Sequence, residues 1–235
     1  MKRMDALFRF LKGFFMKMHK RICLIFSLLI LMLSGYAAHG LAAPAADVPT
    51  ETSPSARAVI SRLDDTLLSC MKQGEKLGFQ GRYNLLLPVM KEAFWYSLMI
   101  RKTTGSYWRK MTPVERKALL DKYITWSVSS YAERFTSYKG QRFVISLSTP
   151  FRVKYWRVVV DIFKQDKKKR SLEYLLAFDS EKENWRIVDI RVKGVSQLSL
   201  TRAQFKAVLK LSGVDGLLAL LDEKIASLRP EEGVD

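Results

Sequence analysis

The stretch QRFVISLSTPFRVKYWRVVVDIFKQDKKKRSLEYLLAFDSEKENWRIVDIRVKGVS, residues 141–196, decides the fold of this chain. It contains four runs in which apolar side chains alternate with polar ones or follow one another, a pattern typical of half-buried β-strands. The last three runs are joined by short polar connections, so we expect them to pair antiparallel as hairpins. The runs cover residues 141–148, 155–163, 172–178 and 186–192.

One face of the predicted sheet is apolar, and other elements must cover it. Because side chains alternate between the two faces of a strand, each run contributes every second residue to this face. The same alternation places Asp161 and Asp189 on the opposite face. The apolar face is predicted to carry Phe143, Ile145 and Leu147, then Trp156, Val158, Val160 and Ile162, then Leu172, Tyr174, Leu176 and Phe178, and finally Val188, Ile190 and Val192.

The N-terminal region is typical of a secretory signal. A positively charged segment, residues 17–21, precedes an apolar segment, residues 22–33, and small residues follow it. We therefore predict a signal peptide over residues 1–42 and export of the rest; an uncleaved membrane anchor is the alternative. The further predicted divisions are a disordered linker over 43–55, a folded domain over 56–229 and a flexible tail over 230–235.

Histidine and cysteine are scarce outside this leader. Both histidines, His19 and His39, and one of the two cysteines, Cys23, lie within residues 1–42. The remaining chain therefore lacks the commonest near-neutral general base and zinc ligand, and it cannot assemble a Ser–His–Asp or Cys–His nucleophile. Its one cysteine, Cys70, cannot form an internal disulfide, and we expect it to be a small buried side chain.

Helical periodicity surrounds the predicted sheet on both sides in the sequence. We expect helices over residues 57–77, 88–100 and 112–136 before the sheet, and over 201–211 and 214–228 after it, separated at Gly213. Capping boxes mark two of the starts, Thr112-Pro113-Val-Glu115 and Thr201-Arg-Ala-Gln204. Helices, then a strand meander, then helices predict an α+β fold.

Two features have both a structural and a functional interpretation. The basic turn at residues 164–170 is either a solvated hairpin tip or a docking site for an anionic membrane surface. Nucleic acid, the other common partner of a basic chain, does not fit an exported protein; the net charge of +17 falls to +11 without residues 1–42. Asp161 and Asp189 are either paired surface groups or catalytic bases of an isomerase-like enzyme.

Four segments, taken together, are similar to one known family. They are GSYWRKMTPVER at residues 105–116, Tyr131-Ala followed by residues 138–141, WRIVDIRVKGVS at residues 185–196, and residues 202–221. In this order and spacing they resemble the MlaC-like, toluene-tolerance-type periplasmic lipid-binding proteins, over about residues 82–224. The segment after Gly194-Val-Ser196 departs from the phospholipid carriers and resembles the hopanoid-associated, HpnM-like branch, which leaves phospholipid and hopanoid both open as the lipid.

The resemblance implies a non-enzymatic lipid carrier without a cofactor. Its expected fold is α+β and NTF2-like: a twisted antiparallel sheet of about four strands, covered by N- and C-terminal helices around an apolar cavity. Its expected partners are an inner-membrane ABC transporter complex and an outer-membrane lipoprotein/porin complex, reached through the periplasm. An isomerase-like enzyme and a protein-binding adaptor are the alternatives. The residues expected to contact lipid are Tyr107, Tyr131, Phe143, Ile145, Val158, Val160, Tyr174, Leu176, Val188 and Ile190.

Overall fold

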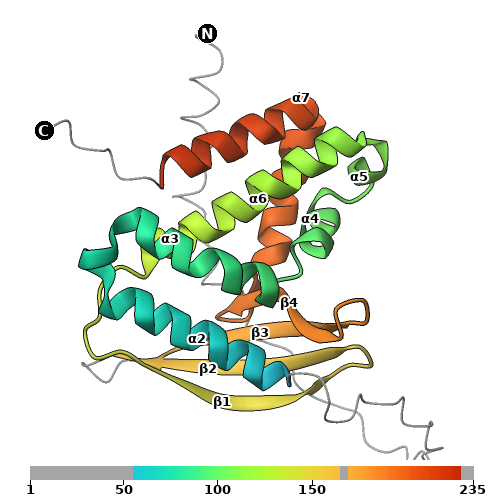
Figure 1. Ribbon diagram of the computed structural model, residues 1–235. Coiled ribbons are helices and arrows are strands. Elements are labelled where there is room, and N and C mark those ends of the chain that lie inside the picture. Colours follow the sequence, from blue (N-terminus) through green and yellow to red (C-terminus); the bar gives the residue numbers. More distant parts are fainter. Residues whose placement is uncertain (1–54, 165–168, 229–235) are drawn as a thin grey trace, which may run out of the picture. The chain divides into compact units, whose positions relative to one another are not determined.

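The computed structural model describes residues 55–164 and 169–228 (Figure 1). The predicted signal peptide, all of the predicted linker except Ser55, the predicted tail and the centre of the basic turn lie outside these residues. No helix within the two described ranges is long and apolar enough to cross a membrane.

The sheet is an antiparallel meander, as the alternation predicts. Its strands follow one another in space in the order of the sequence, and each pairs antiparallel with the next. A short fifth strand extends the predicted set and pairs with the end of the fourth. The strands are β1 (Arg142–Phe151), β2 (Tyr155–Phe163), β3 (Lys169–Asp179), β4 (Asn184–Val192) and β5 (Val195–Ser196).

Two bulges change which residues reach the apolar face. In β1 the register shifts between Ile145 and Leu147, so Ser148 rather than Leu147 lies opposite Val158, and Leu147 is 39% exposed. In β4 the register shifts at Val188, so Ile187 lies opposite Leu176. A bulge leaves one residue unpaired and reverses the alternation beyond it. The prediction that Leu147 belongs to the apolar face is therefore wrong, whereas Val188 is buried in the bulge, at 3% exposure, and Ile187 takes its predicted place in the ladder.

We call the observed apolar face of the sheet the inner face. Its residues are neighbouring cross-strand partners in the ladder and are buried in the core or packed against it. The helices lie over one side of the sheet (Figure 1). They are Phe143, Ile145, Trp156, Val158, Val160, Ile162, Leu172, Tyr174, Leu176, Ile187 and Ile190.

The helical regions are confirmed, but their boundaries differ from the predictions. The first predicted helix is divided at Gln73, and Phe94 and Trp95 interrupt the second. The described helices are α2 (Ala56–Lys72), α3 (Gly74–Ala93), α4 (Tyr96–Thr104), α5 (Tyr107–Lys110), α6 (Pro113–Arg134) and α7 (Gln197–Ala226).

Capping explains where two of these helices begin. At α6 the predicted box is present: the Thr112 hydroxyl accepts from the Glu115 amide at 3.2 Å, and the Glu115 carboxylate accepts from the Thr112 amide at 2.6 Å. The second predicted box is wrong, because α7 begins earlier, with Ser196 as its cap. Gly213 kinks α7 as expected, with a φ of 64°.

The helix α2 lies across the sheet, and α3, α4 and α7 also reach β4 (Figure 1). It contacts β1, β2 and β4, while α3 packs on its other side and on α6. The α3–α4 junction is fixed to the sheet by backbone, because Phe94 forms a parallel bridge with Ile187 and the Trp95 amide donates to the Ile187 carbonyl at 2.9 Å. The core therefore has α2 and the inner face at its centre.

Candidate ligand-binding site

The inner face is enclosed rather than open. Val158, Val160, Tyr174 and Leu176, all predicted to contact lipid, are 0% exposed. The predicted residues Phe143, Ile145 and Ile190 are partly buried and pack against the same core cluster, whereas Val188 is buried in its bulge outside that cluster. The structure therefore brings together most of the predicted residues on one continuous apolar surface.

The cover over this surface is the apolar side of α2. Ile60, Leu63 and Leu67 recur at helical spacing along α2 and are 0% exposed. Two hollows adjoin α2, of about 570 Å³ along residues 55–69 and about 400 Å³ at the turn into α3, and neither is lined by an inner-face residue. Neither of these two hollows therefore opens onto the inner face.

A row of aromatic rings connects the sheet to the helical layer. The Phe143 ring lies 6.4 Å from Phe135, which stacks on Tyr131 at 5.6 Å, and Tyr131 meets the edge of Phe94 at 6.1 Å. The row continues through Tyr96, Tyr123 and Phe205 into α7. Two predicted site residues, Tyr131 and Phe143, are thus joined by a third ring that the prediction did not include.

Tyr107 stands apart from this row. It lies on α5, which follows α4 after the turn at Gly105, and its side chain is partly buried against the helical part of the core. Within the described residues, the structure therefore gives Tyr107 no place beside the inner face.

Two polar groups lie inside this apolar region without hydrogen-bond partners in the described residues. Asp64, on the buried side of α2, is 5% exposed and its Oδ1 has no partner; Tyr174, in the middle of β3, is 0% exposed and its hydroxyl has none. Burial, and then the charge of Asp65, raise the pKa of the Asp64 carboxyl to about 7. An unpaired polar group in a core is costly, which singles out this pair.

The sequence prediction missed Asp64, although a signal was present. Along α2 the apolar positions Ile60, Leu63 and Leu67 define one side of the helix, and Asp64 follows Ile60 by four residues. A carboxylate at that position is placed in the stripe that a helix buries. The structure shows that it is indeed buried there.

The two carboxylates considered as catalytic bases have structural roles. Asp161 accepts hydrogen bonds from the Ser171 hydroxyl at 2.6 Å and from Lys169 at 3.2 Å. The Ser171 hydrogen bond is the main reason that the pKa of Asp161 is lowered, the opposite of what a general base requires. Asp189 accepts from the Leu198 amide at 3.0 Å and so caps the first turn of α7.

The architecture defines a class of protein: an α+β binding domain in which helices enclose the apolar face of an antiparallel sheet. The sequence model of one family, MlaC protein, matches residues 61–223, so the chain belongs to the MlaC family. The family predicted from the four sequence segments is thereby confirmed. The HpnM-like branch stays a prediction.

A solved structure has a similar fold. It is the phospholipid-binding protein from Ralstonia solanacearum in complex with a phospholipid, with a TM-score of 0.63 and 21% sequence identity. The match covers 74% of the present chain and 98% of that one. At this identity the likeness shows the fold, and it confirms the predicted α+β architecture of helices over an antiparallel sheet.

Proposed function

We propose that this protein is a periplasmic lipid carrier that holds acyl chains between the inner face and the helices, and that it acts without catalysing a reaction. The observation that carries the proposal is the enclosed inner face, with Val158, Val160 and Leu176 at its centre, in a chain of the MlaC family. The phospholipid bound by the structurally similar Ralstonia solanacearum protein supports a lipid as the ligand.

The energetics favour such a ligand. Each buried CH₂ group contributes roughly 0.8 kcal/mol, so two acyl chains transferred from a bilayer need an equally apolar and equally dry environment. The inner face and the buried side of α2 supply this environment when they separate around a lipid. The carrier then moves lipid between an outer-membrane lipoprotein/porin complex and an inner-membrane ABC transporter complex. A further proposed role of its exposed surface is to bind a partner protein that delivers or receives lipid.

The test is mass spectrometry of lipids extracted from protein purified without detergent. We expect the wild-type protein to carry lipid, and Val160→Trp to carry much less, because the added ring occupies the centre of the inner face. Val144→Trp is the matched control, since Val144 lies on the same sheet, out of phase with the inner face, and is 40% exposed. A wild-type protein that carries no lipid, from cells or after incubation with vesicles, would refute the proposal.

Export is tested separately. The signal predicted over residues 1–42 implies a mature chain that begins between about residues 41 and 46. Intact-mass measurement of the periplasmic fraction checks this. Recovery only from membranes, with residues 16–40 still attached, would instead identify an anchored protein.

A further inference from the structure

We propose that Asp64 of α2 and Tyr174 of β3 form a buried hydrogen-bonding site for a hydroxyl group carried on an otherwise apolar ligand. The inference rests on the proposed function, because it concerns the ligand held between α2 and the inner face. It specifies a chemical class of ligand: a lipid with a hydroxyl group within its apolar body, rather than a diacyl lipid whose buried parts are hydrocarbon alone.

The two side chains share one interior. Tyr174 lies between Val158 and Ile190 in the ladder, at the centre of the inner face. Asp64 projects from the side of α2 that covers this face, beside Leu63 and Leu67. The two groups are near enough for the Asp64 charge to contribute to the raised pKa of Tyr174, after burial and Tyr131.

Neither group is satisfied by the protein. Asp64 Oδ1 and the Tyr174 hydroxyl both lack a hydrogen-bond partner in the described residues, although both side chains are more than nine-tenths buried. Among the described residues, the charged group that shifts the pKa of the Asp64 carboxyl is Asp65, and no cation does so. Natural proteins rarely bury polar groups in this state, and an exception in a core calls for a specific cause such as a ligand.

The chemistry of the pair fits an alcohol. At pH 8, above its pKa of about 7, the Asp64 carboxylate only accepts hydrogen bonds, whereas a phenol hydroxyl also donates one. A hydroxyl group offers a donor that suits Asp64 and an acceptor that suits Tyr174. A saturated acyl chain offers neither partner and would leave the carboxylate against hydrocarbon. A hydroxylated acyl chain and a polycyclic alcohol both provide the required group.

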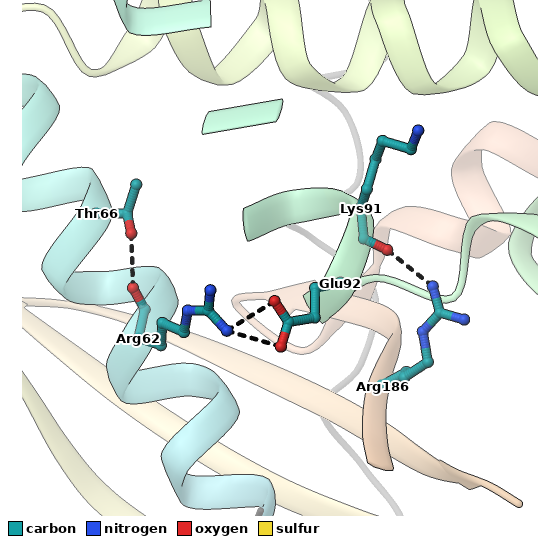
Figure 2. A network of polar contacts seen from close by, with 5 residues as sticks. All are labelled: Arg62, Thr66, Lys91, Glu92 and Arg186. Carbon is teal, nitrogen blue, oxygen red and sulfur yellow. Dashed lines mark hydrogen bonds and ion pairs between the residues drawn. The ribbon is translucent and has the colours of Figure 1, made fainter. Parts of the chain in front are cut away.

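The ion pair that joins the middle of α2 to α3 is weak enough for α2 to move away from the sheet. Arg62 Nη1 meets both carboxylate oxygens of Glu92 on α3 at 2.7 Å (Figure 2). These side chains are 60% and 51% exposed, and such surface pairs contribute about 1 kcal/mol or less. No hydrogen bond or ion pair joins α2 to a strand among the described residues, and the buried side of α2 is formed largely by apolar side chains such as Ile60, Leu63 and Leu67, whose contacts an apolar ligand can replace.

The test is a competition between matched lipids. The full-length mature protein is incubated with vesicles that contain equal amounts of 1-palmitoyl-2-stearoyl phosphatidylcholine and its 12-hydroxystearoyl counterpart, and the bound lipids are measured after re-isolation. In a second arm, cholestanol competes with cholestanone, which can accept but not donate. We expect the lipid bound to the wild-type protein to be enriched about tenfold in the hydroxyl-bearing member of one pair. The pair that shows the enrichment identifies the ligand as a hydroxylated acyl chain or a polycyclic alcohol.

Two variants locate the effect. Tyr174→Phe removes only the hydroxyl, and Asp64→Leu removes the carboxyl; in each we expect the enrichment ratio to fall toward one. Tyr138→Phe, the same change at a residue that is 42% exposed, should keep the wild-type ratio. If Asp64→Leu does not fold, Tyr174→Phe decides, because its ring retains the shape of the original side chain.

The outcomes separate this inference from the proposed function. Lipid uptake without preference in both arms overturns the hydroxyl site and leaves the carrier intact. An enrichment that survives in Tyr174→Phe also overturns it, because the recognised group then binds elsewhere. A protein that takes up no member of either pair contradicts both proposals.

Discussion

The buried carboxyl of Asp64 predicts an unusual dependence of stability on pH. An aspartate in an unfolded chain has a pKa of 3.8, whereas burial raises the pKa of Asp64 to about 7 in the folded protein. The folded state therefore binds the proton more tightly, and stability falls as pH rises from about 4 to about 7. We expect Asp64→Asn to remove this dependence, because the amide does not titrate.

The magnitude follows from the two pKa values. A difference of one pH unit corresponds to about 1.4 kcal/mol, so the whole loss between pH below 4 and pH above 7 is about 4 kcal/mol. Of this loss of stability, about 2.5 kcal/mol falls between pH 5 and pH 8. With a urea m-value of about 2 kcal/mol/M, the wild-type midpoint should fall about 1 M further than that of Asp64→Asn.

The assay is urea unfolding of both proteins, stripped of lipid, at pH 5 and pH 8. Asp161→Asn is the control, because the pKa of Asp161 is shifted in the opposite direction from that of Asp64. The pKa of Asp161 is lowered, chiefly by the Ser171 hydrogen bond, so its contribution is present above pH 4 and is lost only as pH falls further. Asp161→Asn should therefore be destabilised alike at pH 5 and pH 8. Identical pH dependence in wild type and Asp64→Asn would refute the buried, unpaired carboxyl.

Three further predictions concern the packing around α2. Gly74→Ala should lower stability by about 3 kcal/mol or more, because the new Cβ would lie 1.6 Å from the Thr136 carbonyl oxygen. Arg82→Met should cost about 3 kcal/mol, because a buried guanidinium that bonds two backbone carbonyls is lost. Glu92→Gln should raise the reaction rate of Cys70 with a thiol reagent roughly two- to fivefold, because the tie between α2 and α3 is weakened.

Two of these predictions have a control variant in the same molecule. Gly81→Ala meets only the flexible Leu77 side chain at 3.0 Å, and urea unfolding should show a much smaller change. Asp222→Asn removes the ion pair with Lys122 between α6 and α7, so Cys70 labelling should not change. An Arg82→Met protein as stable as wild type, or equal Cys70 labelling in Glu92→Gln, would contradict the corresponding contact.

The strands were predictable because alternation is a local property of the chain. The inner face was not fully predictable, because a bulge depends on how two strands fit each other. Ser146 and Val188 look like ordinary members of an alternating run, and only the register shows that each is an extra residue. In β1 the unpaired residue exchanges Leu147 for Ser148, which moves a polar group inward and a large apolar one outward. In β4 it places Ile187 opposite Leu176 where alternation predicts Val188, and both side chains are buried.

The helix starts show a similar limit of local reasoning. Ser196 and Thr201 both have the chemistry of an N-cap, and the Thr201 segment even has the glutamine of a capping box. The earlier residue prevails because β5 pairs with β4 immediately before it and Asp189 accepts from the Leu198 amide. Inside α7, the Thr201 hydroxyl instead donates to the Gln197 carbonyl at 2.9 Å.

The polar contacts of the described residues indicate which element opens to admit a ligand. The α3–α4 junction is tied to β4 by backbone and by Arg186. The Nη2 of Arg186 donates to the Lys91 carbonyl at 2.9 Å (Figure 2) and to the Phe94 carbonyl at 2.7 Å. Arg186 is in turn paired with the buried Asp179 at 3.0 Å, and breaking such a network costs several kcal/mol.

No comparable tie holds α2 among the described residues. Its exposed ion pair with Glu92 is weak, and it buries Asp64 at a cost that increases as pH rises. The apolar contacts of Ile60, Leu63 and Leu67 therefore hold α2 against the sheet. A bound lipid can replace these contacts without a loss of buried apolar surface. The element that covers the inner face is thus also the least costly to displace, and a lipid that satisfies Asp64 lowers that cost further.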